Sequence, residues 1–122
     1  MQKGSMRLYE LPREMIFRGK REFAAVYNHG RSYANGKMVL YVLRSDGLEG
    51  RVGFAAGKKL GGAVVRNRVK RMLREAYRLF QHEIRADYAI ILVGRKTLVE
   101  AKSNVVSEAF RELCTRAKIL KR

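Results

Sequence analysis

The sequence predicts a small α+β protein, a two-layer sandwich in which helices pack against a small central sheet. Three segments carry apolar residues at helical spacing, and three shorter segments show the alternation or the continuous apolar runs of strands. In chain order these segments read α, β, β, α, β, α, which a sheet covered by helices satisfies. The length of 122 residues allows one hydrophobic core, so we predict a single domain over residues 1–122, with residues 1–16 as a flexible N-terminal extension.

The N-terminal half is predicted to hold one helix and two strands. Residues 20–29 place Phe23 and Tyr27 four positions apart, on one face of a helix. Residues 37–43 contain apolar side chains at period two, and residues 51–56 form a second strand-like segment. The loop between these two segments has the length and the glycines of a hairpin, so we expect the two strands to pair antiparallel.

The C-terminal half is predicted to hold a long helix, a strand and a final helix. The continuous apolar run over residues 88–93 suits burial on both faces, which predicts the central strand of the sheet. Residues 103–117 return to helical spacing. The long helix follows Gly61 and Gly62, and the apolar arc that should face the core comprises Val65, Val69, Met72, Leu73, Ala76, Leu79 and Phe80.

The charge of the chain indicates an acidic partner. Twenty-seven Lys and Arg against 11 Asp and Glu give a formal net charge of +16, which a bound polyanion would neutralise. Nucleic acid fits better than a membrane, with acidic lipid as a minor alternative, because the positive charge is concentrated in a motif flanked by globular patterning. With one cysteine, no apolar run of membrane-spanning length and no signal-like N-terminus, we expect no membrane association and a reduced, cytoplasmic location.

The basic face of the long helix is the sharpest feature of the sequence. Like charges four residues apart on a helix repel by a few tenths of a kcal/mol per pair, roughly, and phosphates would offset that repulsion. A solvated helix face is the alternative, but such faces usually mix signs, and only Glu75 interrupts this run. The candidate residues are Arg66, Asn67, Arg68, Lys70, Arg71, Arg74 and Arg78.

Two further groups are candidates for binding. Lys58 and Lys59 precede the helix N-terminus, where they could clamp phosphate, although a plain flexible turn explains them equally well. Aromatic and apolar side chains could form a floor on which unpaired bases stack, with core packing as the alternative. Spacing alone favours core packing for Phe23 and does not decide between packing and stacking for Tyr27 and Tyr41. The group is Phe23, Tyr27, Val39 and Tyr41.

The chain has few side chains of the types that catalyse reactions in motifs that would signal an active site. His29, His82 and Cys114 form no triad or metal-ligand motif, so we predict no catalytic residue and no metal site. His29 is interpreted as a capping or surface residue. Cys114, on the apolar side of the last helix, is interpreted as a small buried hydrophobic residue.

The segment from Gly53 to Arg71, with the sequence GFAAGKKLGGAVVRNRVKR, resembles the signature of bacterial ribonuclease P proteins. The resemblance extends through most of residues 17–117. The chain departs from the family at Gly62, where Asn is common, and at Tyr27, where Phe is frequent. The resemblance implies an α+β sandwich whose crossover from the second strand, through the basic helix, to the third strand is left-handed, against the general rule for such connections.

The resemblance also implies a function. The chain would be the protein subunit of ribonuclease P, an endoribonuclease in which the RNA subunit, with Mg²⁺, removes the 5′ leader of precursor tRNA. The protein would bind no cofactor itself and would pair one to one with ribonuclease P RNA. The residues that match the RNA-contacting positions are Lys58, Lys59, Arg66, Asn67, Arg68, Lys70, Arg71, Arg74 and Arg78. Those that match the leader-binding positions are Phe23, Tyr27, Val39 and Tyr41, which reverses the preference for core packing at Phe23.

Three other classes remain open. A general RNA-binding or ribosomal protein would share the charge and the basic helix but would lack selectivity for a leader. A DNA-binding module would place the basic helix in a major groove, although the preceding loop lacks a clear helix-turn-helix pair. A nuclease acting by itself would need an acid, base or metal cluster that the sequence does not signal.

Overall fold

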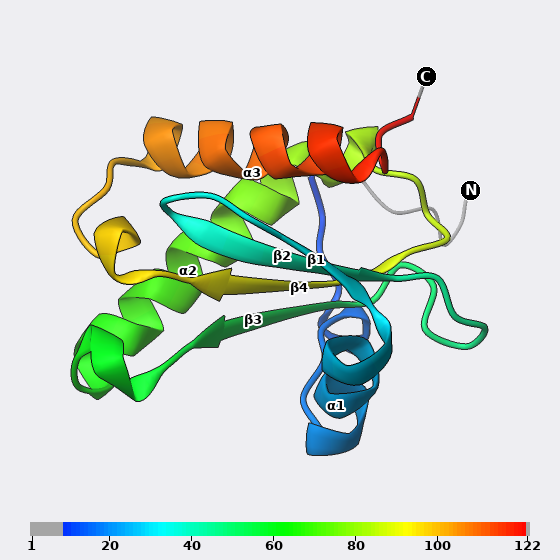
Figure 1. Cartoon of the computed structure of the whole chain (residues 1–122), viewed down its shortest axis with the longest axis horizontal. Helices are drawn as coiled ribbons and strands as arrows, with labels where there is room; N and C mark the ends of the chain where they lie inside the picture. The colour runs from blue at the N-terminus through cyan, green and yellow to red at the C-terminus, as the bar shows by residue number, and fades with distance from the viewer. Residues whose placement is uncertain (1–8, 122) are drawn as a thin grey trace.

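The computed structural model describes residues 9–121, which form one four-stranded sheet with helices on both faces (Figure 1). Strand order across the sheet is β1-β2-β4-β3. The helices and strands are α1 (Lys20–His29), β1 (Arg31–Ala34), β2 (Met38–Leu43), β3 (Val52–Ala56), α2 (Ala63–Phe80), β4 (Ala89–Gly94) and α3 (Ser103–Ala117).

The predicted helices over residues 20–29 and 103–117 are confirmed at both ends. The predicted order α, β, β, α, β, α omits one strand of the structure, β1, which lies between α1 and β2. β1 escapes the apolar pattern because it is four residues long and mostly exposed. It is joined to β2 by a turn in which the Asn35 side-chain oxygen accepts the main-chain N–H groups of Lys37 (3.0 Å) and Met38 (3.1 Å).

The predicted antiparallel pairing of residues 37–43 with residues 51–56 is wrong. β4 lies between β2 and β3, antiparallel to the first and parallel to the second. The reason is burial: the run over Ala89–Leu92 is almost wholly excluded from solvent, so β4 takes the centre of the sheet, as its sequence predicted. β3 is left at the edge.

The connection from β3 to β4 runs through α2 and is a left-handed crossover, as the resemblance implied. In Figure 1 both strands point left, β4 lies above β3, and α2 passes behind the sheet. The left-handed connection brings the N-terminal half of α2 beside the exposed edge of β3. The basic helix therefore borders the sheet.

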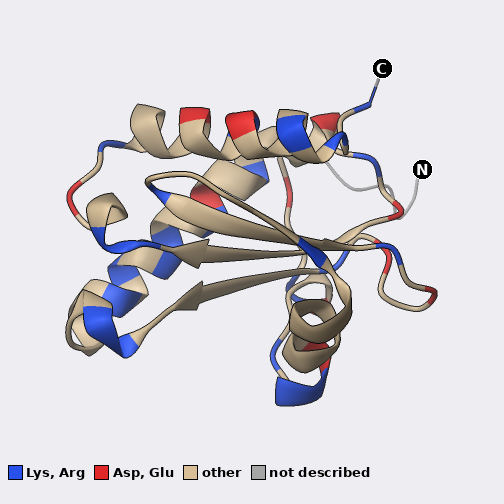
Figure 2. Ribbon diagram, in the orientation of Figure 1, with Lys and Arg blue, Asp and Glu red and all other residues tan. Residues whose placement is uncertain are grey.

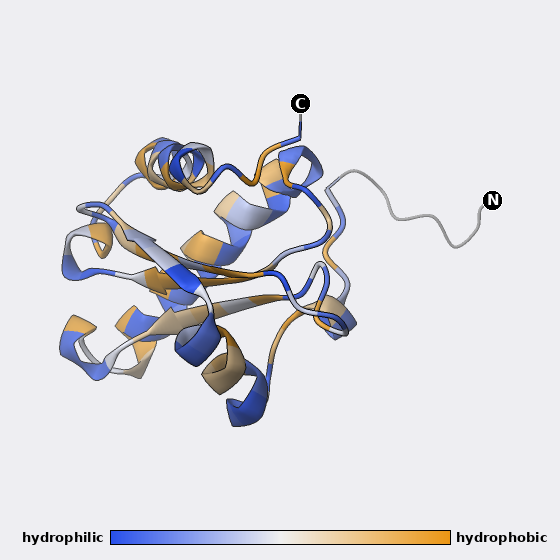
Figure 3. Cartoon of the chain, turned by 45° about the vertical axis from the view of Figure 1, so that its right-hand side comes forward, coloured by the Kyte–Doolittle hydropathy of each residue, from blue (hydrophilic) through white to orange (hydrophobic). Residues whose placement is uncertain are grey.

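One face of the sheet is closed by α2 and α3. Alternate residues of β2 point into this layer, where Met38 and Leu40 are fully buried. Phe110 of α3 is also fully buried and lies against Tyr77 and Phe80, with ring centroids 6.1 and 5.9 Å away. Figure 3 shows the sheet between the helices, with hydrophobic and hydrophilic residues alternating along α2 and α3.

The other face of the sheet is covered only in part, by α1. A small cluster of Phe17, Val26, Ala89 and Ile91 is buried beneath that helix. Beyond it, residues of β2 and β4 on the same face, including Tyr41, stay half-buried. The sheet therefore has a closed face and an open face.

Of the expected flexible extension over residues 1–16, residues 1–8 lie outside the described part of the chain, and the segment from Leu11 to Ile16 packs on the domain. Leu11 and Ile16 contact the main core. Ile16 forms a parallel bridge with Val52, and the N–H of Phe17 donates to the Val52 oxygen at 2.7 Å. The segment thus caps the start of the edge strand β3.

The predicted core arc of α2 needs one correction. Leu79 is 43% exposed, because it lies at the rim of a groove between α2 and α3 and not beneath the helix. Tyr77 takes a core position instead, and burial raises the pKa of its hydroxyl to about 12. Within residues 9–121 no helix has the length and apolar character needed to cross a membrane.

Candidate nucleic-acid interface

A row of aromatic rings crosses the open face between α1 and the sheet. Ring centroids are 5.8 Å apart for Phe17 and Phe23, 6.0 Å for Phe23 and Tyr27, and 4.8 Å for Tyr27 and Tyr41. The last pair is edge-to-face, and Tyr27 is 38% exposed. Three of the four predicted stacking residues therefore lie together. Val39 lies on the same face, two residues along β2 from Tyr41.

Phe23 packs directly on the main chain of β3. A Cβ at Gly53 would lie 2.7 Å from a carbon of the Phe23 ring, so only glycine allows this contact. Phe23 is half-buried and contacts the small cluster beneath α1. One side of Phe23 therefore packs in the core, and the other borders open space.

A groove of about 690 Å³ joins the aromatic row to the basic helix. Its two walls come from segments more than 40 residues apart in the sequence, and the edge strand β3 forms its floor. One wall is Phe17, Arg18 and Phe23, the floor is Phe54, Ala55 and Ala56, and the other wall is Asn67, Lys70, Arg71 and Arg74. One predicted stacking residue, Phe23, thus shares a groove with four of the predicted RNA-contacting residues of α2.

The cations of α2 are available to an external anion. Figure 2 shows them as successive bands along the helix. Asn67, Arg68, Lys70, Arg71 and Arg74 are exposed. None of these cations forms an ion pair with a residue in the described part of the chain. In the described part of the chain, these cations are therefore left without an ion-pair partner.

Arg66 and Arg68 lie apart from the groove. Arg66 is half-buried, and its Nε is shielded from solvent without a partner among the described residues. Arg68 lines the second groove, between α2 and α3. Sequence spacing predicted Arg66 in the main row of cations and Arg68 on its flank. In the structure, α2 presents cations both to the groove beside β3 and to the groove beside α3.

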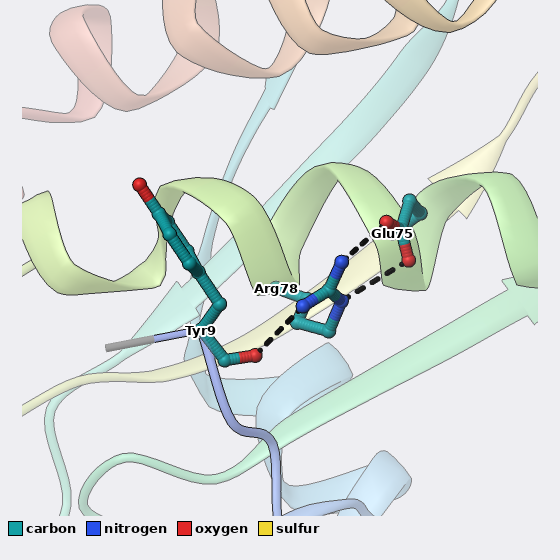
Figure 4. Close-up of polar contacts among 3 residues, drawn as sticks. All are labelled: Tyr9, Glu75 and Arg78. Carbon is teal, nitrogen blue, oxygen red and sulfur yellow. Dashed lines mark hydrogen bonds and ion pairs between the residues drawn. The ribbon is translucent and has the colours of Figure 1, made fainter. Parts of the chain in front are cut away.

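Arg78 differs from the other cations because its donors are used within the protein (Figure 4). Its Nε and one terminal nitrogen donate to the Glu75 carboxylate at 3.1 and 2.6 Å, and the other terminal nitrogen donates to the Tyr9 oxygen at 3.0 Å. The hydrogen bond from Arg78 lowers the pKa of Glu75. Arg78 therefore ties the N-terminal segment to the end of α2.

Lys58 and Lys59 lie in a single 3-10 turn (Lys58–Leu60) and are exposed. Gly61, with φ +141°, has a backbone conformation that favours glycine. Gly62 is the N-cap residue of α2 and supplies no side-chain cap, although a Cβ there would meet nothing within 4 Å. The first turn of the basic helix thus keeps main-chain N–H groups without a side-chain partner at the cap.

Arg51 and Phe17 belong to the site but have no signal in the sequence. The guanidinium of Arg51 lies 5.1 Å from the centre of the Phe17 ring and bonds Glu22 of α1 at 3.0 Å. These contacts hold α1 and the ring row against the sheet. They join residues 29 or more apart in sequence, which local spacing does not reveal.

The interpretation of Cys114 as a buried hydrophobic residue is confirmed. It is fully buried in α3, and burial raises the pKa of its thiol to about 12, so the thiol stays protonated at neutral pH. His29 lies exposed in the last turn of α1. Among the described residues, no three His, Cys, Asp or Glu side chains gather as a metal site would need.

The fold and this groove define a class: small basic α+β proteins with a left-handed crossover, in which a cationic helix borders an aromatic-lined sheet. Residues 11–118 match the sequence profile of the family described as Ribonuclease P. The chain therefore belongs to the ribonuclease P protein family, whose role is tRNA processing. The resemblance of the segment from Gly53 to Arg71 is thereby confirmed.

Similar proteins agree with this assignment. The ribonuclease P protein component of Symbiobacterium thermophilum is 46% identical over 101 residues, covering 82% of this chain and 88% of that protein. That of Desulfovibrio desulfuricans is 45% identical over 98 residues, covering 79% and 75%. The RNase P protein of Staphylococcus aureus superimposes with a TM-score of 0.77 at 26% identity, covering 88% and 98%. That of Thermotoga maritima gives 0.72 at 28%, covering 82% and 94%.

Proposed function

We propose that this chain binds ribonuclease P RNA together with the single-stranded 5′ leader of precursor tRNA, and so assists RNA-catalysed removal of the leader. The observation that carries the proposal is the groove in which an aromatic wall faces a cationic wall across the edge of the sheet. Family membership supplies the RNA context.

The leader is assigned to the open face and its groove. Unpaired bases stack on aromatic rings, and Tyr27 offers an exposed ring within the row. Phe23, Tyr41 and Val39 extend this surface over the sheet. Lys70 and Arg74, on the facing wall, lie where the leader would meet the catalytic RNA, so they would neutralise phosphates at that junction.

The catalytic RNA is assigned to the outward cations. Arg68 and Arg71 face the second groove, while the lysine turn adds positive charge beside the uncapped start of α2. Main-chain N–H groups and the helix dipole favour anions there. The proposed contacts are Lys58, Lys59, Arg66, Asn67, Arg68, Lys70, Arg71 and Arg74, with Arg78 assigned to the fold because its donors are engaged.

In this proposal the protein contributes binding and not bond cleavage. Lysine and arginine side chains lower the repulsion between the two RNAs, and the aromatic row fixes the leader. Magnesium would be held by the RNA, which would carry out the hydrolysis. One protein per RNA, in the cytoplasm, completes the assignment.

The test is cleavage of precursor tRNA by a bacterial ribonuclease P RNA at low magnesium, with long-leader and leaderless substrates. We expect the chain to stimulate cleavage more with the leader than without it. Tyr27→Ala should abolish that difference. Tyr9→Ala, which removes a similarly exposed tyrosine outside the groove, is the matched control and should preserve it.

Other outcomes would support other classes. Equal stimulation of both substrates would indicate a general RNA-binding protein. Binding to duplex DNA as tight as binding to either RNA would indicate a DNA-binding module. Cleavage by the purified chain without RNA would show that it is itself a nuclease, and any of these results would overturn the proposal.

A further inference from the structure

A second group of cations lies away from the groove, at the other end of the sheet. We call it the distal arc and define it as Arg31, Arg44, Arg85, Lys118 and Lys121. All five are exposed. They come from the start of β1, the end of β2, the segment before β4 and the residues after α3. The fold therefore gathers cations from four separate parts of the chain.

Contacts join these residues into one surface. Asp87 pairs with Arg44 at 2.6 Å and with Arg85 at 3.5 Å, so it links the two arginines. Both guanidiniums also lie over the Tyr88 ring, at 5.7 and 5.6 Å from its centre. The centre of the arc is thus ordered before any ligand binds, which lowers the entropic cost of binding.

Two hollows flank this ordered centre. Arg31 and Arg44 line a small one of about 250 Å³, between β1, β2 and the end of α3. Arg85, Lys118 and Lys121 line the other. Each hollow is therefore bordered by cations that the fold brings together from distant parts of the sequence.

The positive charge of the arc is mostly unmatched. Arg31, Lys118 and Lys121 form no ion pair with a described residue, and Asp87 pairs only with the two arginines. Glu83, whose main-chain oxygen accepts the Lys121 N–H, directs its carboxylate to His82 at 3.6 Å. Five cations around one paired carboxylate leave an excess that phosphates would neutralise.

The arc and the basic start of α2 lie at opposite ends of the molecule. In Figure 1, β1 begins and α3 ends at the right, whereas α2 begins at the lower left. Figure 2 shows Lys and Arg at both ends. A single RNA segment held in the groove would leave the arc uncovered.

We propose that the distal arc binds the phosphate backbone of double-stranded RNA. The open face of the sheet offers Tyr27, whose ring is exposed, whereas the arc has no exposed aromatic residue and the guanidiniums of Arg44 and Arg85 lie over its Tyr88 ring. Unpaired bases thus have no exposed ring to stack on, while a duplex keeps its bases stacked inside and is contacted mostly through its phosphates and 2′-hydroxyls. The chain then binds two RNA segments at once. The inference rests on the proposed function only in taking RNA as the polyanion.

The test uses the full chain with its groove saturated by single-stranded RNA, and a blunt RNA duplex of about 20 base pairs as the probe. We expect the wild type to bind the duplex under these conditions. The triple variant Arg31→Gln, Lys118→Gln and Lys121→Gln should lose about tenfold in affinity, and the slope of log affinity against log salt should shrink by about 2 to 3. Arg44 and Arg85 stay, because they hold the local structure.

The matched control is the triple variant Arg13→Gln, Lys20→Gln and Lys102→Gln, which removes the same charge from exposed residues outside both surfaces. It should bind the duplex nearly as the wild type does, and thermal melting should show both variants folded. Equal losses in the two variants, no loss in the arc variant, or no duplex binding by the wild type would overturn the inference. Single-stranded binding measured alongside reports separately on the proposed function.

Discussion

The two faces of the sheet are built from the same strands and are used differently. Along β2, Met38 and Leu40 point into the closed face and are fully buried, while Val39 and Tyr41, one position on, stay half-buried on the open face. Two helices cover the first face, and only one short helix covers the second. Strand alternation thus separates a stabilising surface from one available for binding.

This difference separates two kinds of substitution. Residues of the closed face contribute free energy of unfolding through burial, whereas residues of the open face can contribute to binding because they retain exposed surface. A substitution in the closed face should lower stability, whereas truncation of an exposed side chain on the open face should weaken binding and leave stability nearly unchanged.

The largest expected effect is on the closed face. Phe110→Ala removes a fully buried ring and should lower the free energy of unfolding by about 3 to 5 kcal/mol. Urea denaturation measures this loss. Phe23→Ala, the matched change on the open face, should cost clearly less, and equal losses would show that the open face is as much a core as the closed one.

A second prediction concerns the contact beneath the aromatic row. Gly53→Ala introduces a Cβ about 2.7 Å from the Phe23 ring, which must move. We expect a loss of about 1 to 3 kcal/mol in stability, typical of overpacking. Affinity for the leader should fall as well. Gly57→Ala is the control, because a Cβ there meets nothing within 4 Å.

A third prediction isolates binding on the open face. Tyr41→Ala should weaken binding of a leader-bearing precursor tRNA by about 1 to 3 kcal/mol, the usual value of one base stacked on a ring. Fluorescence titration measures it. Affinity for a leaderless tRNA should not change, and a loss common to both substrates would contradict a leader site here.

A fourth prediction separates Arg78 from the other cations. The depressed pKa of Glu75 means that its ion pair with Arg78 stabilises the fold above the ordinary carboxyl value of 4.5, and that this stabilisation disappears as pH falls through the lowered pKa. Arg78→Gln should therefore lower the melting temperature slightly at pH 7, and its difference from the wild type should shrink as the pH falls below 4.5. Lys70→Gln should leave melting unchanged and weaken RNA binding, and the reverse pattern would refute the distinction.

The smallest expected effect is at the start of the basic helix. Gly62→Asn supplies the missing N-cap side chain in open space and should raise stability by a few tenths of a kcal/mol, roughly. Thermal melting against Gly62→Ala, which adds a side chain without a cap, checks it. A stabilisation equal in both variants would show that capping is not the cause.

Local patterns predicted the helices, and long-range contacts decided the rest. The ends of α1 and α3 follow from periodicity within each segment. The pairing of β3 does not follow from such local periodicity, because its partner strand β4 is separated from it in the sequence by the whole of α2. Likewise, sequence reasoning found Phe23 and Lys70 separately, and only the crossover brings them to one groove.

The most direct test of the open face is photo-crosslinking of a precursor tRNA that carries 4-thiouridine in its leader, within the complex of this chain and ribonuclease P RNA. The account predicts crosslinks to the aromatic row, at Tyr27 and Tyr41, that disappear when an unlabelled leader competes. Crosslinks confined to the closed side, such as the outer surface of α3, would contradict it.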